Sequence, residues 1–171
     1  MTIADAAASG LAAVACIADV GWRRVPNVVT FGGAALALLI AAGTGGVSAF
    51  GLALAGCFVG LLLFLPLFAL GGLGAGDVKL LAALGAWLGP RDVVYVALYG
   101  AIAGGVFAVV LAYSRGYLRT AFSNVYALLT FWRVAGLRPM EGLTLDAAPG
   151  PRLAYALPMT AGLAVTLWLN R

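Results

Sequence analysis

The sequence predicts an all-α, polytopic membrane protein with about six transmembrane helices and a cytoplasmic interfacial amphipathic helix. Of its 171 residues, 64% are hydrophobic and only 9% are charged, whereas about half of the residues of a soluble domain are apolar. Long apolar runs are separated by connections that hold most of the charged residues, and the stretch 116–138 has an amphipathic pattern. We expect residues 1–171 to form a single membrane-embedded domain.

The first apolar run extends from Ile3 to Val20. It lacks the basic start of a secretory signal peptide, because Asp5 is its only charge before Asp19, so we interpret it as a permanent span. Cys16 and Cys57 lie inside apolar runs and form no Cys-x-x-Cys. They predict neither a zinc site nor a disulfide framework.

Five further spans are separated by polar or glycine-rich connections. They are Val28–Ala42, Ala49–Leu70, Asp77–Leu88, Val93–Ser114 and Leu153–Asn170. The fourth span is only roughly 18 Å long at about 1.5 Å per residue, whereas the hydrocarbon core is about 30 Å thick. We therefore expect either a locally thinned bilayer or a glycine-rich connection that dips into a small wet cavity.

The segment from Gly116 to Arg138 carries apolar residues at helical spacing. They are Leu118, Ala121, Phe122, Val125, Tyr126, Leu129 and Trp132. Flanking arginines favour an amphipathic helix in the membrane interface. A seventh span fits less well, because Ser123 and Asn124 would then lie in mid-membrane. Residues 139–151 are expected to form a loop.

The cations predict how the protein is oriented. Eight fall in the connections after the first, third and fifth spans, namely Arg23, Arg24, Lys79, Arg115, Arg119, Arg133, Arg138 and Arg152. The opposite side receives Arg91 and Arg171. By the positive-inside rule the basic side is cytoplasmic and the N-terminus is outside. The net charge of +4 thus fits lipid headgroups better than nucleic acid.

Two polar connections on the cytoplasmic side each carry an aspartate. The sequence 71–79 holds Asp77 and Lys79 after a run of glycines, and the sequence 19–30 holds Asp19 before Pro26 and Asn27. An ionisable residue beside hydrocarbon is a candidate for function. On one membrane face, the two carboxylates can come together.

Structural roles remain open for these same residues. Asp77 is also suited to cap a helix, and Asp19 to pair with Arg23. Lys79 is also suited to place its charge at the membrane edge. Asn27 is suited to cap the second span.

The sequence contains no histidine, which excludes a Ser-His intramembrane protease and a histidine-ligated zinc protease. A carboxylate pair without a metal or cofactor remains. An ionised aspartate can take a proton from water while a protonated one polarises a peptide carbonyl. Helix ends favour a charged Asp77 and a protonated Asp19, although Arg23 and Arg24 are able to reverse this assignment.

The residues 74–80, Gly-Ala-Gly-Asp-Val-Lys-Leu, fit a Gly-x-Gly-Asp signature. Together with Asp19 ahead of Val25-Pro26-Asn27 and with the six-span layout, the chain resembles the type IV prepilin peptidases. The resemblance maps the family's two catalytic aspartates onto Asp19 and Asp77. It implies cleavage of a basic prepilin leader on the cytoplasmic side of the bacterial inner membrane, just after a glycine and before the hydrophobic pilin helix. The residues expected to support the site or contact substrate are Pro26, Asn27, Gly74, Gly76 and Lys79.

Larger members of that family carry a cytoplasmic insertion with paired Cys-x-x-Cys motifs and also methylate the new N-terminus. This sequence contains neither feature, so it resembles the short, peptidase-only branch associated with Flp or tight-adherence pili. The expected partners are a prepilin and membrane lipids. Two alternatives stay open: a preflagellin or other Gly-x-Gly-Asp intramembrane protease, and a non-enzymatic proton-coupled transporter or assembly factor that uses Asp19 and Asp77 as a relay.

Overall fold

The computed structural model describes residues 2–140, 142–144 and 154–170. Within these ranges the regular structure consists of α1 (Ile3–Trp22), α2 (Asn27–Ala69), α3 (Ala75–Ser114), α4 (Leu118–Ala135) and α5 (Ala156–Leu169). The expected all-α class is confirmed. The helices α1, α2 and α3 are long and apolar enough to cross a membrane, and α5 is a shorter apolar helix.

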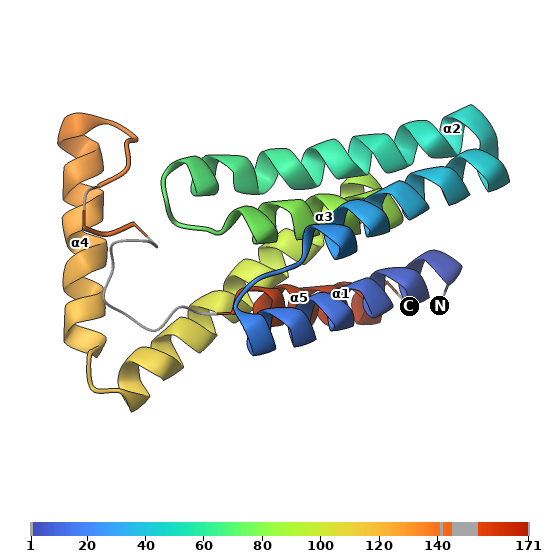
Figure 1. Ribbon diagram of the computed structural model, residues 1–171. Coiled ribbons are helices and arrows are strands. Elements are labelled where there is room, and N and C mark those ends of the chain that lie inside the picture. The colour runs from blue at the N-terminus through green and yellow to red at the C-terminus, as the bar shows by residue number, and fades with distance from the viewer. Residues whose placement is uncertain (1, 141, 145–153, 171) are drawn as a thin grey trace.

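The two longest helices are helical hairpins. The helix α2 is interrupted at Gly46 (φ 62°, ψ −152°) and α3 at Gly89 (φ 83°, ψ 175°), in backbone conformations that favour glycine because it lacks a Cβ. Each helix reverses its direction at that kink (Figure 1). Within the described residues, α1, the two legs of α2, the two legs of α3, and α5 therefore make six passes through the bundle. Both breaks fall between the predicted spans.

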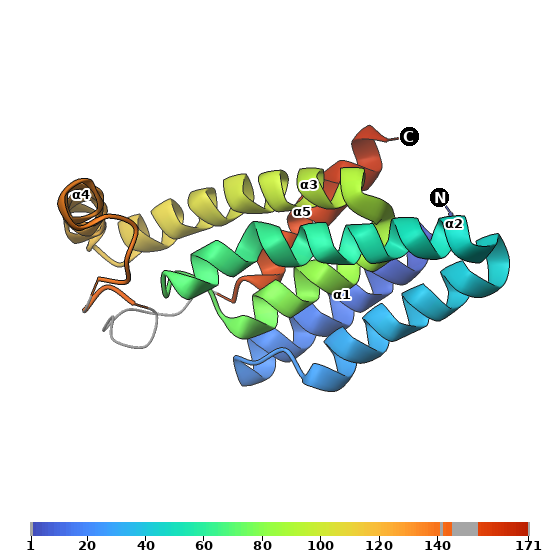
Figure 2. The same ribbon diagram turned by 90° about the horizontal axis from the view of Figure 1, so that it is seen from above.

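The passes divide the molecule into two ends. The connections 23–26 and 70–74 lie at one end, which also faces α4 (Figure 1). The two glycine kinks and both chain termini lie at the other end, as Figure 2 also shows. Every predicted site residue therefore belongs to a single end of the bundle.

Close packing depends on small residues. Gly56 in α2 faces Gly85 in α3, and a Cβ on either would overlap the backbone carbonyl of the other. Gly162 in α5 lies in the same way against the backbone of Gly100. Small residues at such positions let the backbones of neighbouring membrane helices approach closely. Helix α1 adds a stripe of fully buried alanines, Ala8, Ala12 and Ala15.

Large apolar side chains face outward. In the most apolar windows of α1, α2 and α3 only 28%, 22% and 28% of the residues are buried. Among the exposed ones are Leu39, Phe58, Leu62, Leu98 and Ile102. A soluble monomer rarely exposes so much apolar surface. This surface fits the hydrocarbon of a bilayer, where each helix satisfies its own backbone hydrogen bonds.

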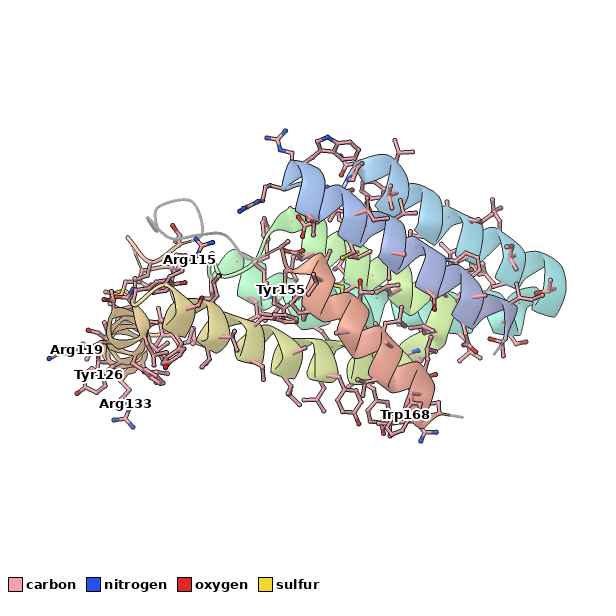
Figure 3. All side chains as sticks on the ribbon, turned by 90° about the horizontal axis from the view of Figure 1, so that it is seen from below. Arg115, Arg119, Tyr126, Arg133, Tyr155 and Trp168 are labelled. Carbon is pink, nitrogen blue, oxygen red and sulfur yellow. The ribbon has the colours of Figure 1, made fainter. Side chains whose placement is uncertain are left out.

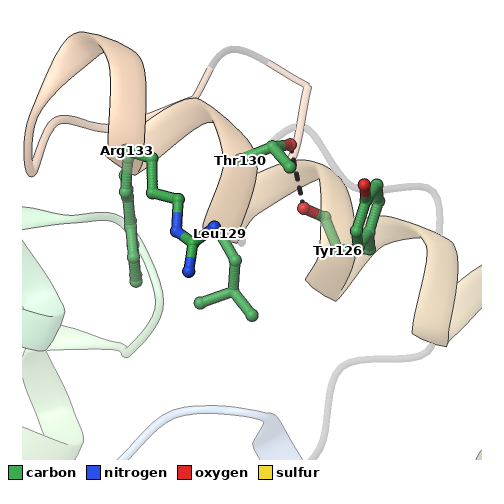
Figure 4. Close-up of a pocket in the computed structure, with 5 residues that line it drawn as sticks. Tyr126, Leu129, Thr130 and Arg133 are labelled. Carbon is green, nitrogen blue, oxygen red and sulfur yellow. Dashed lines mark hydrogen bonds between the residues drawn. The ribbon is translucent and has the colours of Figure 1, made fainter.

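The helix α4 stands apart from the bundle and runs across its long direction (Figure 1). All of α4 is described, and none of its residues is buried. Tyr126, Leu129, Thr130, Trp132 and Arg133 line a hollow of about 410 Å³ on it (Figure 4). The helix predicted over 116–138 is thus confirmed as a helix. Arg152, Arg171 and most of the predicted loop lie outside the described residues.

Candidate active site

Asp19 lies in the last turn of α1 and is only 8% exposed. Its carbonyl oxygen accepts a hydrogen bond from the amide of Arg23, whose left-handed conformation (φ 55°) ends the helix. Its carboxylate Oδ2 accepts a hydrogen bond of 3.2 Å from the backbone amide of Ala156, the first residue of α5. Helix α5 therefore holds the side chain of Asp19 at the site end of the bundle.

Asp77 lies in the first turn of α3. The helix begins at Ala75, two residues before the approximate start predicted for this span, and Gly74 occupies the N-cap. The Gly74 amide donates to Asp77 Oδ2 at 3.2 Å, which satisfies an amide that the helix itself leaves unpaired. A Cβ on Gly74 would lie 3.1 Å from this oxygen. Glycine at position 74 therefore leaves space for the Asp77 carboxylate.

A pocket of about 440 Å³ joins the two polar connections. It is lined by Asp19, Arg23, Arg24, Val25, Pro26, Asn27, Gly74, Ala75, Gly76 and Asp77. The charge of Asp19 acts on Asp77 across this pocket, so ionising both carboxylates at once is costly. The structure thus brings six of the seven predicted site residues together, and their functional roles stay predictions.

Lys79 is the predicted site residue outside the pocket lining. Its Nζ donates to Asn27 Oδ1 at 3.0 Å and lies 5.2 Å from the centroid of the Phe31 ring. The expected capping of α2 by Asn27 is not seen. Pro26 occupies the N-cap position of this helix, and no side chain forms a capping hydrogen bond there. The Asn27 side chain instead joins α2 to α3 beside the pocket.

Helix ends alone do not distinguish the two carboxylates. The sequence places Asp19 near a helix C-terminus, which opposes its ionisation. In the structure, the Asp19 carboxylate also lies at the N-terminus of α5, where the Ala156 amide donates to it. Asp77 lies at the N-terminus of α3. Each carboxylate therefore accepts one backbone hydrogen bond at a helix N-terminus. The expectation of a protonated Asp19 loses its basis in the helix dipole.

The contribution of α5 is absent from the predicted site. The sequence indicates an apolar final span but carries no signal that the span begins against Asp19. Its position follows from the hairpins, since six passes bring the start of α5 to the same end as both aspartates (Figure 1).

These features define a helical membrane protein with an acid pair in a pocket at one end of its bundle. Residues 6–109 match the type IV leader peptidase family, and the chain belongs to that family of aspartic-type peptidases. The matched range contains both Asp19 and Asp77, whereas α4 and α5 lie beyond it.

Two curated relatives are similar over a shorter stretch. They are described as prepilin leader peptidase/N-methyltransferase and come from Burkholderia pseudomallei strains 1026b and K96243. Each is 47% identical over 57 residues, which is 33% of this chain and 18% of the relative. The similarity thus spans less than a fifth of the length of these relatives. No solved structure matches this chain.

Proposed function

We propose that the protein is an aspartic endopeptidase that cleaves the leader of type IV, Flp-like prepilins at the cytoplasmic face of the inner membrane. The observation that carries the proposal is the shared pocket of Asp19 and Asp77, two acids from separate helices. Family membership supports a leader peptidase, and the relatives' description supports a prepilin substrate.

The reaction requires one ionised and one protonated carboxyl group. The ionised carboxylate takes a proton from water while the water oxygen bonds to the scissile carbonyl carbon. The carbonyl π electrons move to its oxygen, which takes the proton of the second carboxyl group. When the tetrahedral intermediate collapses, the C–N bond breaks and the amine takes a proton from the first carboxyl group. One hydroxyl group of the intermediate returns its proton to the second carboxylate as the new carbonyl group forms. The repulsion between Asp19 and Asp77 supports a pair that shares one proton.

We propose six membrane crossings: α1, the two legs of α2, the two legs of α3, and α5. The fourth of these crossings is the first leg of α3, residues 75–88. It is about 21 Å long, which is less than the hydrocarbon thickness of about 30 Å. A short leg draws its first turn, and with it Asp77, below the membrane surface. The hydrophobic helix of a prepilin then enters laterally from the lipid, and its scissile bond reaches the acids at the interface.

Charge supports the orientation. Among the described residues, Arg91 is the cation at the far end, whereas Arg23, Arg24, Lys79, Arg115, Arg119, Arg133 and Arg138 lie in or beside the connections of the site end. By the positive-inside rule, that end faces the cytoplasm. Arg119 and Arg133 on α4 point away from the bundle (Figure 3). The exposed helix α4 then lies in the interface, where these arginines reach lipid headgroups.

We further propose a peptidase without methyltransferase activity. The sequence has two cysteines and no Cys-x-x-Cys, and both are free thiols on α1 and α2. Mass spectrometry of the cleaved pilin, incubated with a methyl donor, tests this point. An unmethylated N-terminus is expected, and a methylated one would contradict the proposal.

The proposal is tested with full-length protein in detergent and a prepilin that has a basic leader, a glycine at the cleavage site and a hydrophobic helix. Asp19→Asn and Asp77→Asn are each expected to abolish shortening of the substrate. Asp92→Asn is the matched control, because this acid lines a cavity at the far end of the bundle. Wild-type protein that leaves every such prepilin intact would favour a proton relay over a peptidase.

A further inference from the structure

The helices α3 and α5 enclose a second polar space at the far end of the bundle. Their backbones meet where Gly162 lies against Gly100. Beyond that crossing, the start of the second leg of α3 and the end of α5 enclose a space of about 200 Å³, which we call the α3–α5 hollow. Its described lining residues are Arg91, Tyr95, Tyr99, Thr166, Leu169 and Asn170. Because the Gly89 kink and the C-terminal end of α5 lie at the far end (Figure 2), the hollow lies opposite to the acid pair.

The three α3 side chains of the hollow share one face of the helix. Arg91, Tyr95 and Tyr99 follow one another at intervals of four residues, which places them one above the other. The rings of Tyr95 and Tyr99 are stacked, with centroids 6.3 Å apart and an interplanar angle of 19°. Among the described residues, no hydrogen bond or salt bridge engages the side chains of these three. Five guanidinium N–H groups and two hydroxyl groups are therefore free to bind a ligand.

The chemistry of the hollow favours an anion. None of its described lining residues is acidic. Asp92, the next residue, lines only a larger cavity that Arg91 also borders, and no salt bridge joins the two. Arg91 lies in the first turn after the kink at Gly89, where the amides at the start of a helix also attract anions. Arginine suits phosphate in particular, because its planar N–H fork matches the phosphate oxygens.

The position of the hollow indicates that this phosphate belongs to a lipid. Trp168 lies at this end of α5, opposite Tyr155 (Figure 3), and is 71% exposed. Aromatic side chains at the end of a membrane crossing mark the level of the headgroups. Farther along the same leg of α3, Leu98 and Ile102 expose apolar surface. A phospholipid whose phosphate enters the hollow can therefore lay its acyl chains along α3. One cation without a neighbouring acid in the hollow favours a headgroup with a net negative charge.

We propose that the α3–α5 hollow binds the headgroup phosphate of an anionic phospholipid from the leaflet at the far end. Arg91 pairs with the phosphate, and the hydroxyl groups of Tyr95 and Tyr99 donate to its oxygens. The bound lipid fills the space between α3 and α5 and stabilises α5, whose other end holds Asp19. Binding is noncovalent and independent of the proposed peptidase function.

Thermal unfolding of the full-length protein in neutral detergent tests the proposal. The midpoint is followed against the concentration of short-chain phosphatidylglycerol and of phosphatidylcholine with the same chains, because a ligand of the folded state raises it by mass action. We expect phosphatidylglycerol to bind at least about fivefold more tightly, the usual contribution of one arginine beside anionic lipid. Arg91→Gln should remove this preference. Arg115→Gln is the matched control, since it removes the same charge where α3 ends at the site end, and it should keep the preference.

A second variant tests the hydroxyl groups. Tyr95→Phe combined with Tyr99→Phe keeps both rings and should weaken the binding of both lipids by at least about threefold. Equal affinities of the wild-type protein for the two lipids would overturn the proposal. So would a preference that survives Arg91→Gln, or unchanged binding in the double tyrosine variant, which decides the matter if Arg91→Gln does not fold. Inorganic phosphate at the same concentrations should not raise the midpoint. An equal effect of inorganic phosphate would show a site for a soluble anion and contradict a lipid site.

Discussion

The backbone amide of Ala156 donates a hydrogen bond of 3.2 Å to the carboxylate of Asp19. This contact joins the last helix of the bundle to the first. A second polar contact between these two helices runs from Thr160 Oγ1, one turn farther along α5, to the Ala12 carbonyl at 3.3 Å. Helix α5 therefore holds the Asp19 carboxylate of α1, although the pocket itself is lined by residues of α1, α2, α3 and the connections between them. The conformation of the Asp19 carboxylate depends on a helix outside the range that matches the family.

Gly74 and Gly76 should differ in their tolerance of alanine. A Cβ at position 74 would press on Asp77 Oδ2 at 3.1 Å, whereas one at position 76 would make an ordinary contact of 3.4 Å with Val25. Small displacements of a reacting group are costly. We expect Gly74→Ala to lower kcat about tenfold and Gly76→Ala to lower it less than about threefold. Equal losses in a prepilin cleavage assay would contradict this role of Gly74.

Gly56 is predicted to be essential for packing. A Cβ there would overlap the carbonyl of Gly85, and backbone cannot move aside as a flexible side chain can. Gly56→Ala should therefore destabilise the protein by about 1–3 kcal/mol. Gly51, in the same helix, has open space around its Cα, and Gly51→Ala should be neutral or stabilising by up to about 1 kcal/mol. Unfolding in mixed micelles measures both, and a stable Gly56→Ala protein would contradict the close approach.

Local sequence signals predicted much of this fold. Apolar runs identified the helices, and the interval between the predicted spans that end at Leu88 and begin at Val93 contains the break in α3 at Gly89. Both aspartates were found because charge is rare in so apolar a chain. The predicted start of α3 lies two residues after the observed one. An aspartate after a run of glycines is typical of a helix cap. Asp77 instead lies inside the first turn, where its carboxylate accepts a hydrogen bond from the Gly74 amide.

The contacts that complete the site were not predictable. The sequence indicates a local role for Asn27 as a helix cap, whereas its side chain accepts a hydrogen bond from Lys79 on another helix. Ala156 contacts Asp19 through its backbone amide, and its apolar side chain gives no sequence signal that it belongs to a site. Both contacts depend on how the hairpins pack, which no single segment encodes.

Asn27 and Lys79 should be energetically coupled. Their hydrogen bond of 3.0 Å is exposed, so its net contribution is about 0.5–1 kcal/mol. We expect Asn27→Ala and Lys79→Met each to lower the thermal midpoint, and the double variant to lose less than the sum. A double-mutant cycle measures this coupling. Strictly additive effects would indicate that the two side chains do not meet in the membrane-embedded protein.

Two serines test the orientation. Ser48 follows the Gly46 kink at the far end, and Ser114 ends α3 at the site end. Both are exposed. In a background with Cys16→Ser and Cys57→Ser, an impermeant thiol reagent applied to intact cells should label Ser48→Cys and not Ser114→Cys, because the basic end faces the cytoplasm. The reverse pattern would contradict a cytoplasmic site.

The most direct measurement is the kcat for prepilin cleavage by Asp19→Asn, Asp77→Asn and the double variant, with each protein shown to be folded and membrane-inserted. If the two carboxylates act as a unit on one water molecule, each single variant loses at least about 1000-fold and the double variant is no slower than either. A single variant within about tenfold of wild type, or losses that multiply in the double variant, would show that the acids do not act together.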